Sequence, residues 1–176
     1  MSVPPPTSPA EPAEPEAGAV LWTPAAERAV ERLVAAAREV LEMDVAWLGE
    51  VCGDDLLFRA LAGDRAFLGL APGDRIPLGA SYCGFLVDGR IGGVVSDVPA
   101  HPQLGGLRLT RAAGVGAYVG IPVRLGDGRL FGTLCCAGRR RRPEIGERDL
   151  RMLRVLAGLV AAHVDELPRE PLRPEA

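Results

Sequence analysis

The chain has 176 residues, of which 48% are hydrophobic, so it is long enough for one well-buried core and too short for two domains of ordinary size. Its 20 basic and 23 acidic side chains give a formal net charge of −3, which excludes the strongly basic surface that nucleic-acid binding needs. No apolar run reaches the roughly 18 residues of a transmembrane helix, and no signal peptide is recognisable, so we expect a cytoplasmic protein that does not enter the membrane.

The first predicted element is a helix that follows a low-complexity segment. Residues 1–22 and 168–176 are rich in Pro, Ala and Glu, a composition that cannot offset the entropy of ordering, and we expect them to be disordered tails. Thr23 and the proline after it are typical of a helix start, and apolar residues then recur at helical spacing over 24–42. This predicts one domain over residues 23–167.

Short apolar segments separated by turn residues follow this helix. Residues 45–52 and 56–63 flank a Gly-Asp-Asp turn and predict a β-hairpin. After a loop rich in Gly and Pro, we expect a short helix over 81–89 that opens with a serine cap, a strand over 91–97, and a loop with one helical turn over 101–114.

A second hairpin is predicted around Asp127-Gly128, a pair typical of a two-residue turn with both residues at positive φ. Counting outward from the turn gives the register Leu125–Leu130, Arg124–Phe131, Val123–Gly132, Pro122–Thr133, Ile121–Leu134, Gly120–Cys135, Val119–Cys136 and Tyr118–Ala137.

The two faces of this hairpin differ in chemistry. One face carries only aliphatic or small groups and is suited to packing against helices. The other carries a phenol, a hydroxyl, a thiol and a glycine gap, and is suited to lining a cavity. Because side chains alternate along a strand, the adjacent Cys135 and Cys136 should point to opposite faces, with only Cys135 toward the cavity.

The last predicted helix begins near Glu147 and Asp149, two acids that favour a first helical turn. It carries two apolar seams, Met152/Val155/Leu159 and Leu153/Leu156/Val160. One seam is enough to cover a sheet. The second indicates either a homodimer formed through this helix together with residues 24–42, or burial of both seams within the monomer by the first helix.

The motifs in the second half of the chain resemble those of a GAF domain. The resemblance covers residues 24–166 and is carried by "SYCGFLVDGRIGGVVSDVPAHP", "LRLTRAAGVGAYVGIPVRLGDGRLFGTLCCAGR" and "ERDLRMLRVLAGLVAAHV". It implies an α+β fold related to PAS domains, with a central antiparallel sheet, terminal helices on one face that often dimerise, and a loop-covered ligand pocket on the other. It also implies a role in signal transduction beside an output protein.

The resemblance does not extend to the ligands or catalysis of three GAF branches. The Cys-His pair of bilin-binding relatives falls here on Gly105 and Gly106, and the axial His of haem-binding relatives falls on Arg111 or Ala112. In free methionine-(R)-sulfoxide reductases, Cys83-Gly84 resembles one site, but the reactive cysteine is replaced by Gly105 or Gly106. We therefore expect no cofactor, and a non-enzymatic domain that senses an unknown small molecule and signals through terminal-helix dimerisation. The alternatives are a thiol enzyme of the reductase type and a ligand-free dimerisation scaffold.

The residues predicted to line the ligand pocket are Tyr82, Cys83, Asp97, Arg111, Tyr118, Phe131, Thr133 and Cys135. For Asp97 and Arg111, surface ion pairing is the alternative. We expect no metal site, since the cysteines lack CxxC spacing and neither histidine has companion ligands. His101 is expected to order its loop by hydrogen bonding, with direct ligand contact as the alternative. The arginines at 139–142 are expected to form a solvated charged loop, with phosphate binding as the alternative. Trp47 is expected in the core, with the pocket wall as the alternative. Cys83 is interpreted as a buried inert thiol, with a redox-responsive thiol as the alternative.

Overall fold

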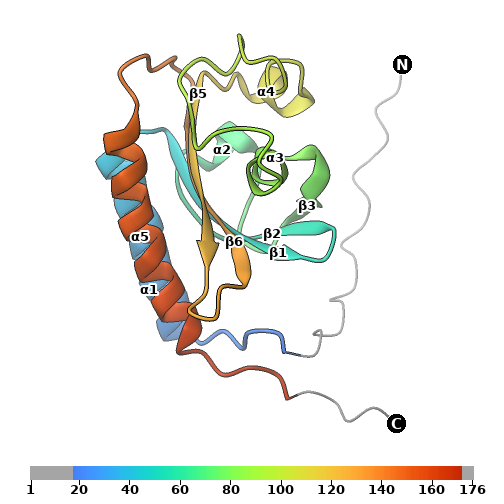
Figure 1. Ribbon diagram of the computed structural model, residues 1–176, viewed down its shortest axis with the longest axis vertical. Helices are drawn as coiled ribbons and strands as arrows, with labels where there is room; N and C mark the ends of the chain where they lie inside the picture. The colour runs from blue at the N-terminus through green and yellow to red at the C-terminus, as the bar shows by residue number, and fades with distance from the viewer. Residues whose placement is uncertain (1–17, 172–176) are drawn as a thin grey trace.

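The computed structural model describes residues 18–171 (Figure 1). Its strands are β1 Val45–Cys52, β2 Asp55–Gly63, β3 Arg75–Pro77, β4 Val94–Val95, β5 Ala117–Arg124 and β6 Leu130–Gly138. Its helices are α1 Pro24–Leu41, α2 Arg65–Leu68, α3 Tyr82–Val87, α4 Arg108–Ala113 and α5 Glu147–Asp165, with a 3-10 turn over Leu78–Ala80.

The strands form one six-stranded antiparallel sheet in the order β3-β2-β1-β6-β5-β4. Helices α1 and α5 lie side by side over one face, and α2, α3 and α4 lie over the other (Figure 1). The predicted α+β architecture, with a central antiparallel sheet and terminal helices on one face, is confirmed. The sheet therefore separates two cores of different composition.

Local capping explains where the helices begin. The Thr23 hydroxyl accepts a hydrogen bond from the Ala26 N–H at the start of α1, and the Ser81 hydroxyl accepts one from the Gly84 N–H at the start of α3. Both caps agree with the sequence prediction. The Gly/Pro-rich loop, however, contains α2 and β3, which the sequence pattern does not predict.

The β5–β6 register agrees with the prediction from Tyr118–Ala137 to Val123–Gly132. The turn itself differs, because Gly128 has a positive φ of 86° and Asp127 does not. The Gly128 N–H donates to the Leu125 carbonyl, which makes a three-residue turn closed by a left-handed glycine. The expected pairing near the turn is therefore wrong.

The longer turn displaces one residue of β6. Arg124 pairs with Leu130, and Phe131 is the extra residue of a β-bulge. A bulge reverses the alternation of side chains, so Phe131 belongs to the helix-side core, where its ring lies 6.2 Å from that of Trp22. The prediction of Phe131 as a pocket residue is wrong for this reason.

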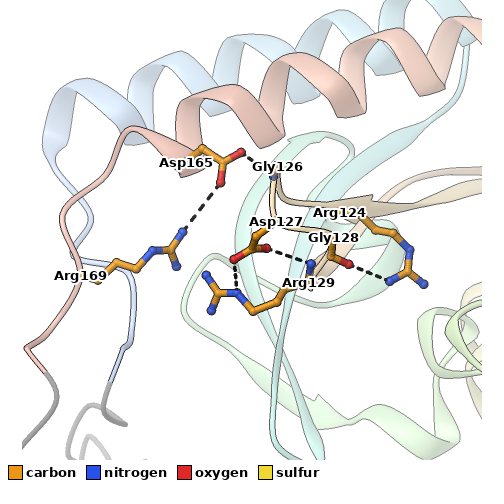
Figure 2. Close-up of polar contacts among 7 residues, drawn as sticks. All are labelled: Arg124, Gly126, Asp127, Gly128, Arg129, Asp165 and Arg169. Carbon is orange, nitrogen blue, oxygen red and sulfur yellow. Dashed lines mark hydrogen bonds and ion pairs between the residues drawn. The ribbon is translucent and has the colours of Figure 1, made fainter.

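The hairpin tip is tied to the end of α5 (Figure 2). The Asp165 carboxylate accepts a hydrogen bond from the Gly126 N–H at 2.8 Å and pairs with Arg169. Asp127 accepts from the Arg129 N–H at 2.9 Å, which lowers the pKa of Asp127 and fixes the turn. The tip of the β5–β6 hairpin and the exit of α5 are thus held together.

The chain segments outside α1 and α5 are also paired. Val20 and Arg169 form an antiparallel β-bridge, and the Leu21 N–H donates to the Pro168 carbonyl at 2.8 Å. Residues 18–22 and the segment after α5 therefore extend the folded unit beyond the predicted 23–167. The rest of the expected tails, residues 1–17 and 172–176, lies outside the described residues.

Candidate functional site

The two faces of the β5–β6 hairpin contact different cores, as their chemistry predicted. Val119 and Cys136 face the core under α1 and α5, whereas Tyr118 and Cys135 face the core under α3 and the loops. The adjacent cysteines thus point in opposite directions, and only Cys135 faces the side expected to bind a ligand.

Sulfur atoms meet at the centre of this loop-side core. Cys83 on α3 and Cys135 on β6 are 1% and 0% exposed, and their Sγ atoms are 3.8 Å apart. The Trp47 Nε1–H donates to Cys83 Sγ at 3.4 Å, and Tyr118 Oη lies 3.1 Å from Cys135 Sγ. We call Trp47, Cys83, Tyr118 and Cys135 the thiol cluster.

A glycine makes room for the thiol cluster. A Cβ at Gly120 would lie 2.2 Å from Tyr118 Oη and 3.0 Å from Cys135 Sγ. The phenol of Tyr118 therefore lies back over Gly120 and reaches the thiol. The predicted glycine gap exists, and the Tyr118 side chain occupies it.

The two thiols of the cluster have opposite pKa shifts. A hydrogen bond from Cys135 lowers the pKa of Cys83, although burial opposes this shift. Burial raises the pKa of Cys135 well above its usual value, and the neighbouring Cys83 raises it further. Burial also raises the pKa of Tyr118, so its phenol stays neutral. Cys83 is thus the member of the pair that is favoured as a thiolate.

Thr133 lies next to the thiol cluster and is fully buried. Its hydroxyl makes no hydrogen bond of good geometry to any described residue, although it lies close enough to lower the pKa of Cys83. A second polar contact, between the Tyr82 and Thr110 hydroxyls, ties α3 to α4. Thr110 in turn donates to the Leu104 carbonyl at 2.6 Å. The roof over the site is therefore joined through buried polar groups.

The hollow expected on this side is much smaller than a ligand. It has a volume of about 10 Å³, which is about the space of one water molecule. The rings of Trp47 and Phe58, together with Tyr82, fill the space between the sheet and α3. The residues around the hollow are Trp47, Leu56, Phe58, Leu68, Leu70, Ile76, Ser81, Tyr82, Cys83, Leu109 and Ala137.

The structure brings together five of the eight predicted pocket residues. Tyr82 and Cys83 line the hollow, and Tyr118, Thr133 and Cys135 lie buried on the same side of the sheet.

The other three predicted pocket residues lie elsewhere. Asp97 pairs with Arg141 at 3.2 Å and accepts from the Ala100 N–H, and Arg111 is exposed on α4. Phe131 lies on the helix side, as described above. For Asp97 the alternative of a surface ion pair is therefore the one that the structure shows, and the loop geometry around Ala100 directs its side chain there.

Trp47 takes both of the positions that its sequence left open, the core and the wall of the hollow. It is 4% exposed, as expected of a core residue, but it also donates to Cys83 and lines the hollow. Trp47 is directly opposite Cys135 in the β1–β6 register. Residues directly paired on neighbouring strands point to the same face of the sheet, so the Trp47 ring lies on the same face as that thiol.

The remaining polar candidates have structural roles. His101 Nδ1 accepts from the N–H groups of Gln103 and Leu104, which orders the loop as predicted. Arg139 pairs with Asp64 at 2.9 Å and stays half exposed, as expected of a charged loop. Arg142 differs from that prediction, since its side chain is mostly buried and donates to the Leu41 and Glu42 carbonyls at the end of α1. Within residues 18–171, no group of three or more His, Cys, Asp and Glu side chains could hold a metal ion.

The helix side carries an apolar seam that no described residue covers. Leu153 and Val160 are fully buried against the sheet, whereas Met152, Val155 and Leu159 are 43%, 64% and 49% exposed. The alternative in which α1 buries both seams within the monomer is therefore wrong. The neighbouring Val40 on α1 is 48% exposed, and we call Val40, Met152, Val155 and Leu159 the apolar seam.

An open cleft of about 540 Å³ adjoins one end of the apolar seam, between the end of α1 and the start of α5. Val40 and Met152 line it together with charged groups that include Arg142 and Glu144. The apolar seam is thus continuous with a concave, polar surface.

This fold is that of a family whose members are generally signalling or sensory domains: the GAF domain family matches residues 25–164, and the chain belongs to it. The structure resembles a free methionine-R-sulfoxide reductase from Neisseria meningitidis, with 22% identity, TM-score 0.63, and coverage of 80% of this chain and 78% of that chain. It also resembles the blue-light absorbing form of the PixJ GAF domain from Thermosynechococcus elongatus, with 20% identity, TM-score 0.64, and coverage of 80% and 85%.

A type II free methionine-R-sulfoxide reductase from Thermoplasma acidophilum matches with 19% identity, TM-score 0.60, and coverage of 84% of this chain and 99% of that chain. At these identities the structural matches define the fold alone. No curated protein sequence matches the chain. None of the described helices has the length and apolar character needed to cross a lipid bilayer.

Proposed function

We propose that this GAF domain is a non-enzymatic regulatory module that acts as a homodimer in cytoplasmic signal transduction. The observation that carries the proposal is the apolar seam, which leaves Met152, Val155 and Leu159 exposed on a helix whose other apolar face is buried against the sheet. Large apolar side chains gathered on one face of a folded domain are typical of a protein–protein interface. A second copy of the chain would cover them with the same seam, as two-fold symmetry requires.

The seam is also placed to carry a signal. Helix α5 packs on β5, and its last turn is tied to the hairpin tip through Asp165 and Gly126 (Figure 2). A change in the hairpin can therefore alter how α5 meets its partner. Such a change shifts the equilibrium between two arrangements of the helices in the dimer only by as much as it stabilises one arrangement more than the other.

The experiment is sedimentation velocity over a concentration series of the full chain. The wild type should sediment as a dimer, and Val155→Glu should sediment as a monomer, because the glutamate would place a charge inside the interface without touching the core. Arg154→Glu is the matched control, since Arg154 is exposed on the same helix outside the seam. A monomeric wild type would refute the proposal. A dimeric Val155→Glu variant would show that the dimer interface does not include the apolar seam.

Small-molecule sensing on the loop side is a second candidate, supported by the buried Thr133 hydroxyl without a good partner and by the mixed chemistry around it. Because the hollow holds about one water, a ligand would have to displace α3 or α4. Tyr82, Cys83, Tyr118, Thr133 and Cys135 would contact it. Native mass spectrometry of protein purified from its own host tests this, since a retained ligand adds mass. Loss of that added mass in Thr133→Val would place the ligand at this site.

The reductase alternative is weaker for the same reason. A hollow of about 10 Å³ beside Cys83 does not admit methionine sulfoxide unless the roof opens. A thioredoxin-coupled assay with free methionine-(R)-sulfoxide would show turnover if the roof did open. Absence of turnover in that assay removes the alternative.

A further inference from the structure

Cys83 and Cys135 lie close enough to form a covalent bond with a small movement. Their sulfur atoms are 3.8 Å apart although the residues are 52 positions apart in the chain. A disulfide requires about 2.05 Å, so the two sulfurs must approach by a little under 2 Å. Cys135 lies on β6, which is hydrogen-bonded to strands on both sides, whereas α3 has only six residues. Helix α3 is therefore the element that moves.

We propose that Cys83 and Cys135 are a redox-active dithiol that hydrogen peroxide converts to a disulfide. Disulfide formation would not require the dimer. Only a signalling role for the disulfide rests on the function proposed above. It selects the redox-responsive interpretation of Cys83 over the inert one.

The surroundings of Cys83 differ from those of an inert buried thiol. The indole N–H of Trp47 is a donor only, so at 3.4 Å it supplies a hydrogen bond to the sulfur and favours the thiolate. The neighbouring Cys135 lowers the pKa of Cys83 and keeps its own proton. Cys136, by contrast, is buried among aliphatic side chains on the other face, and burial raises its pKa.

The small hollow adjoins Cys83 and is the route by which we expect a small oxidant to reach it. It is lined by Cys83 and extends to Leu68, Leu70 and Ile76, which are only partly buried, so its outer end lies near the surface. Its volume of about 10 Å³ matches a molecule not much larger than water. Hydrogen peroxide is the oxidant of that size, and a branched alkyl hydroperoxide is too large.

The chemistry balances in two steps. The Cys83 thiolate attacks one oxygen of hydrogen peroxide: the S–O bond forms, the O–O bond breaks, and hydroxide leaves and takes up a proton as water. The resulting sulfenic acid is attacked by the Cys135 sulfur: the S–S bond forms, the S–O bond breaks, and a second water leaves with the Cys135 proton. Two thiols are oxidised to one disulfide, and one peroxide is reduced to two waters.

The test maps cross-linked peptides after peroxide treatment of the folded chain. The protein is treated with hydrogen peroxide, alkylated under denaturing conditions, and digested with trypsin without reduction. Cleavage after arginine places Cys83 in peptide 76–90, and Cys135 and Cys136 together in peptide 130–139. Wild type and the matched control Cys136→Ser should both give the linked peptides. Cys83→Ser and Cys135→Ser should lose them.

Three results would overturn the proposal. The first is absence of the link in wild type while methionine oxidation shows that the peroxide acted. The second is survival of the link in Cys135→Ser, which would implicate Cys136. The third is disulfide formation that is as fast with tert-butyl hydroperoxide as with hydrogen peroxide. The oxidant would then not reach Cys83 through the hollow, and hydrogen peroxide would not be the oxidant that the site selects.

If a serine variant fails to fold, wild type and Cys136→Ser still decide the question. A dimedone adduct on Cys83 in folded Cys135→Ser would support the sulfenic acid step. Repeating the mapping in Val155→Glu keeps the two proposals separate, since the link should form in a monomer as well.

Discussion

Replacement of Gly120 by alanine should destabilise the domain, because the glycine leaves room for Tyr118. A Cβ there would lie 2.2 Å from Tyr118 Oη and 2.7 Å from its Cζ, and Tyr118 is fully buried and cannot move into solvent. Forcing an extra methyl into a packed core costs about 1–3 kcal/mol, and loss of the contact to Cys135 adds about 1 kcal/mol. We therefore expect the free energy of unfolding to fall by about 2–4 kcal/mol.

The assay is urea unfolding at one fixed protein concentration, with Gly158→Ala as the matched control. Gly158 is exposed in the middle of α5 and nothing lies within 4 Å of its added Cβ, so alanine there should stabilise the domain by about 0.5–1 kcal/mol. Gly120→Ala combined with Tyr118→Phe should recover part of the loss, because the phenol oxygen is the atom in closest conflict. A Gly120→Ala variant within about 0.5 kcal/mol of wild type would show that Tyr118 does not lie over Gly120.

Three further changes test the core, an ion pair and a cap. Leu153→Ala should lower the free energy of unfolding by about 2–5 kcal/mol because Leu153 is fully buried, whereas Arg154→Ala, exposed on the same helix outside the apolar seam, should change it by less than about 0.5 kcal/mol; urea unfolding at one fixed protein concentration measures both. The hydrogen bond from Arg139 lowers the pKa of Asp64, so this carboxylate stabilises the folded state above its ordinary value of 3.8 and loses that effect as the pH falls through the lowered value. The urea midpoint of Asp64→Asn should therefore fall less steeply below pH 3.8 than that of wild type. Ser81→Ala removes the cap of α3 and should cost about 1 kcal/mol of unfolding free energy by the same assay, against a negligible change for an exposed α1 substitution such as Glu31→Ala.

The sequence predicts the part of the fold that depends on periodicity. A two-residue period is enough to pair Gly120 with Cys135 and to separate Cys135 from Cys136, because a one-residue slip would bury the wrong face. The turn is less certain from sequence, since a Gly-Asp-Gly segment fits both a two-residue turn and a three-residue turn with a bulge. That single residue determines on which side of the sheet Phe131 lies.

The candidate site could be predicted in composition but not in volume. Alternation identifies which side chains face the loops, but not how far rings such as Trp47 fill the space between layers. The contact between Cys83 and Cys135 was also beyond the sequence pattern, because α3 reaches β6 through loops whose conformation depends on the finished core. Asp97 shows the same limit, since its orientation is fixed by the Ala100 N–H and by Arg141.

The bridge between Val20 and Arg169 has a consequence for protein engineering. In such a bridge the two Cα atoms are about 5 Å apart, so the chain enters and leaves the domain through a single narrow gap. The whole unit can therefore be grafted into an exposed loop of an unrelated host without stretching either protein. A host whose fluorescence depends on the closure of that loop would report any shift at this gap.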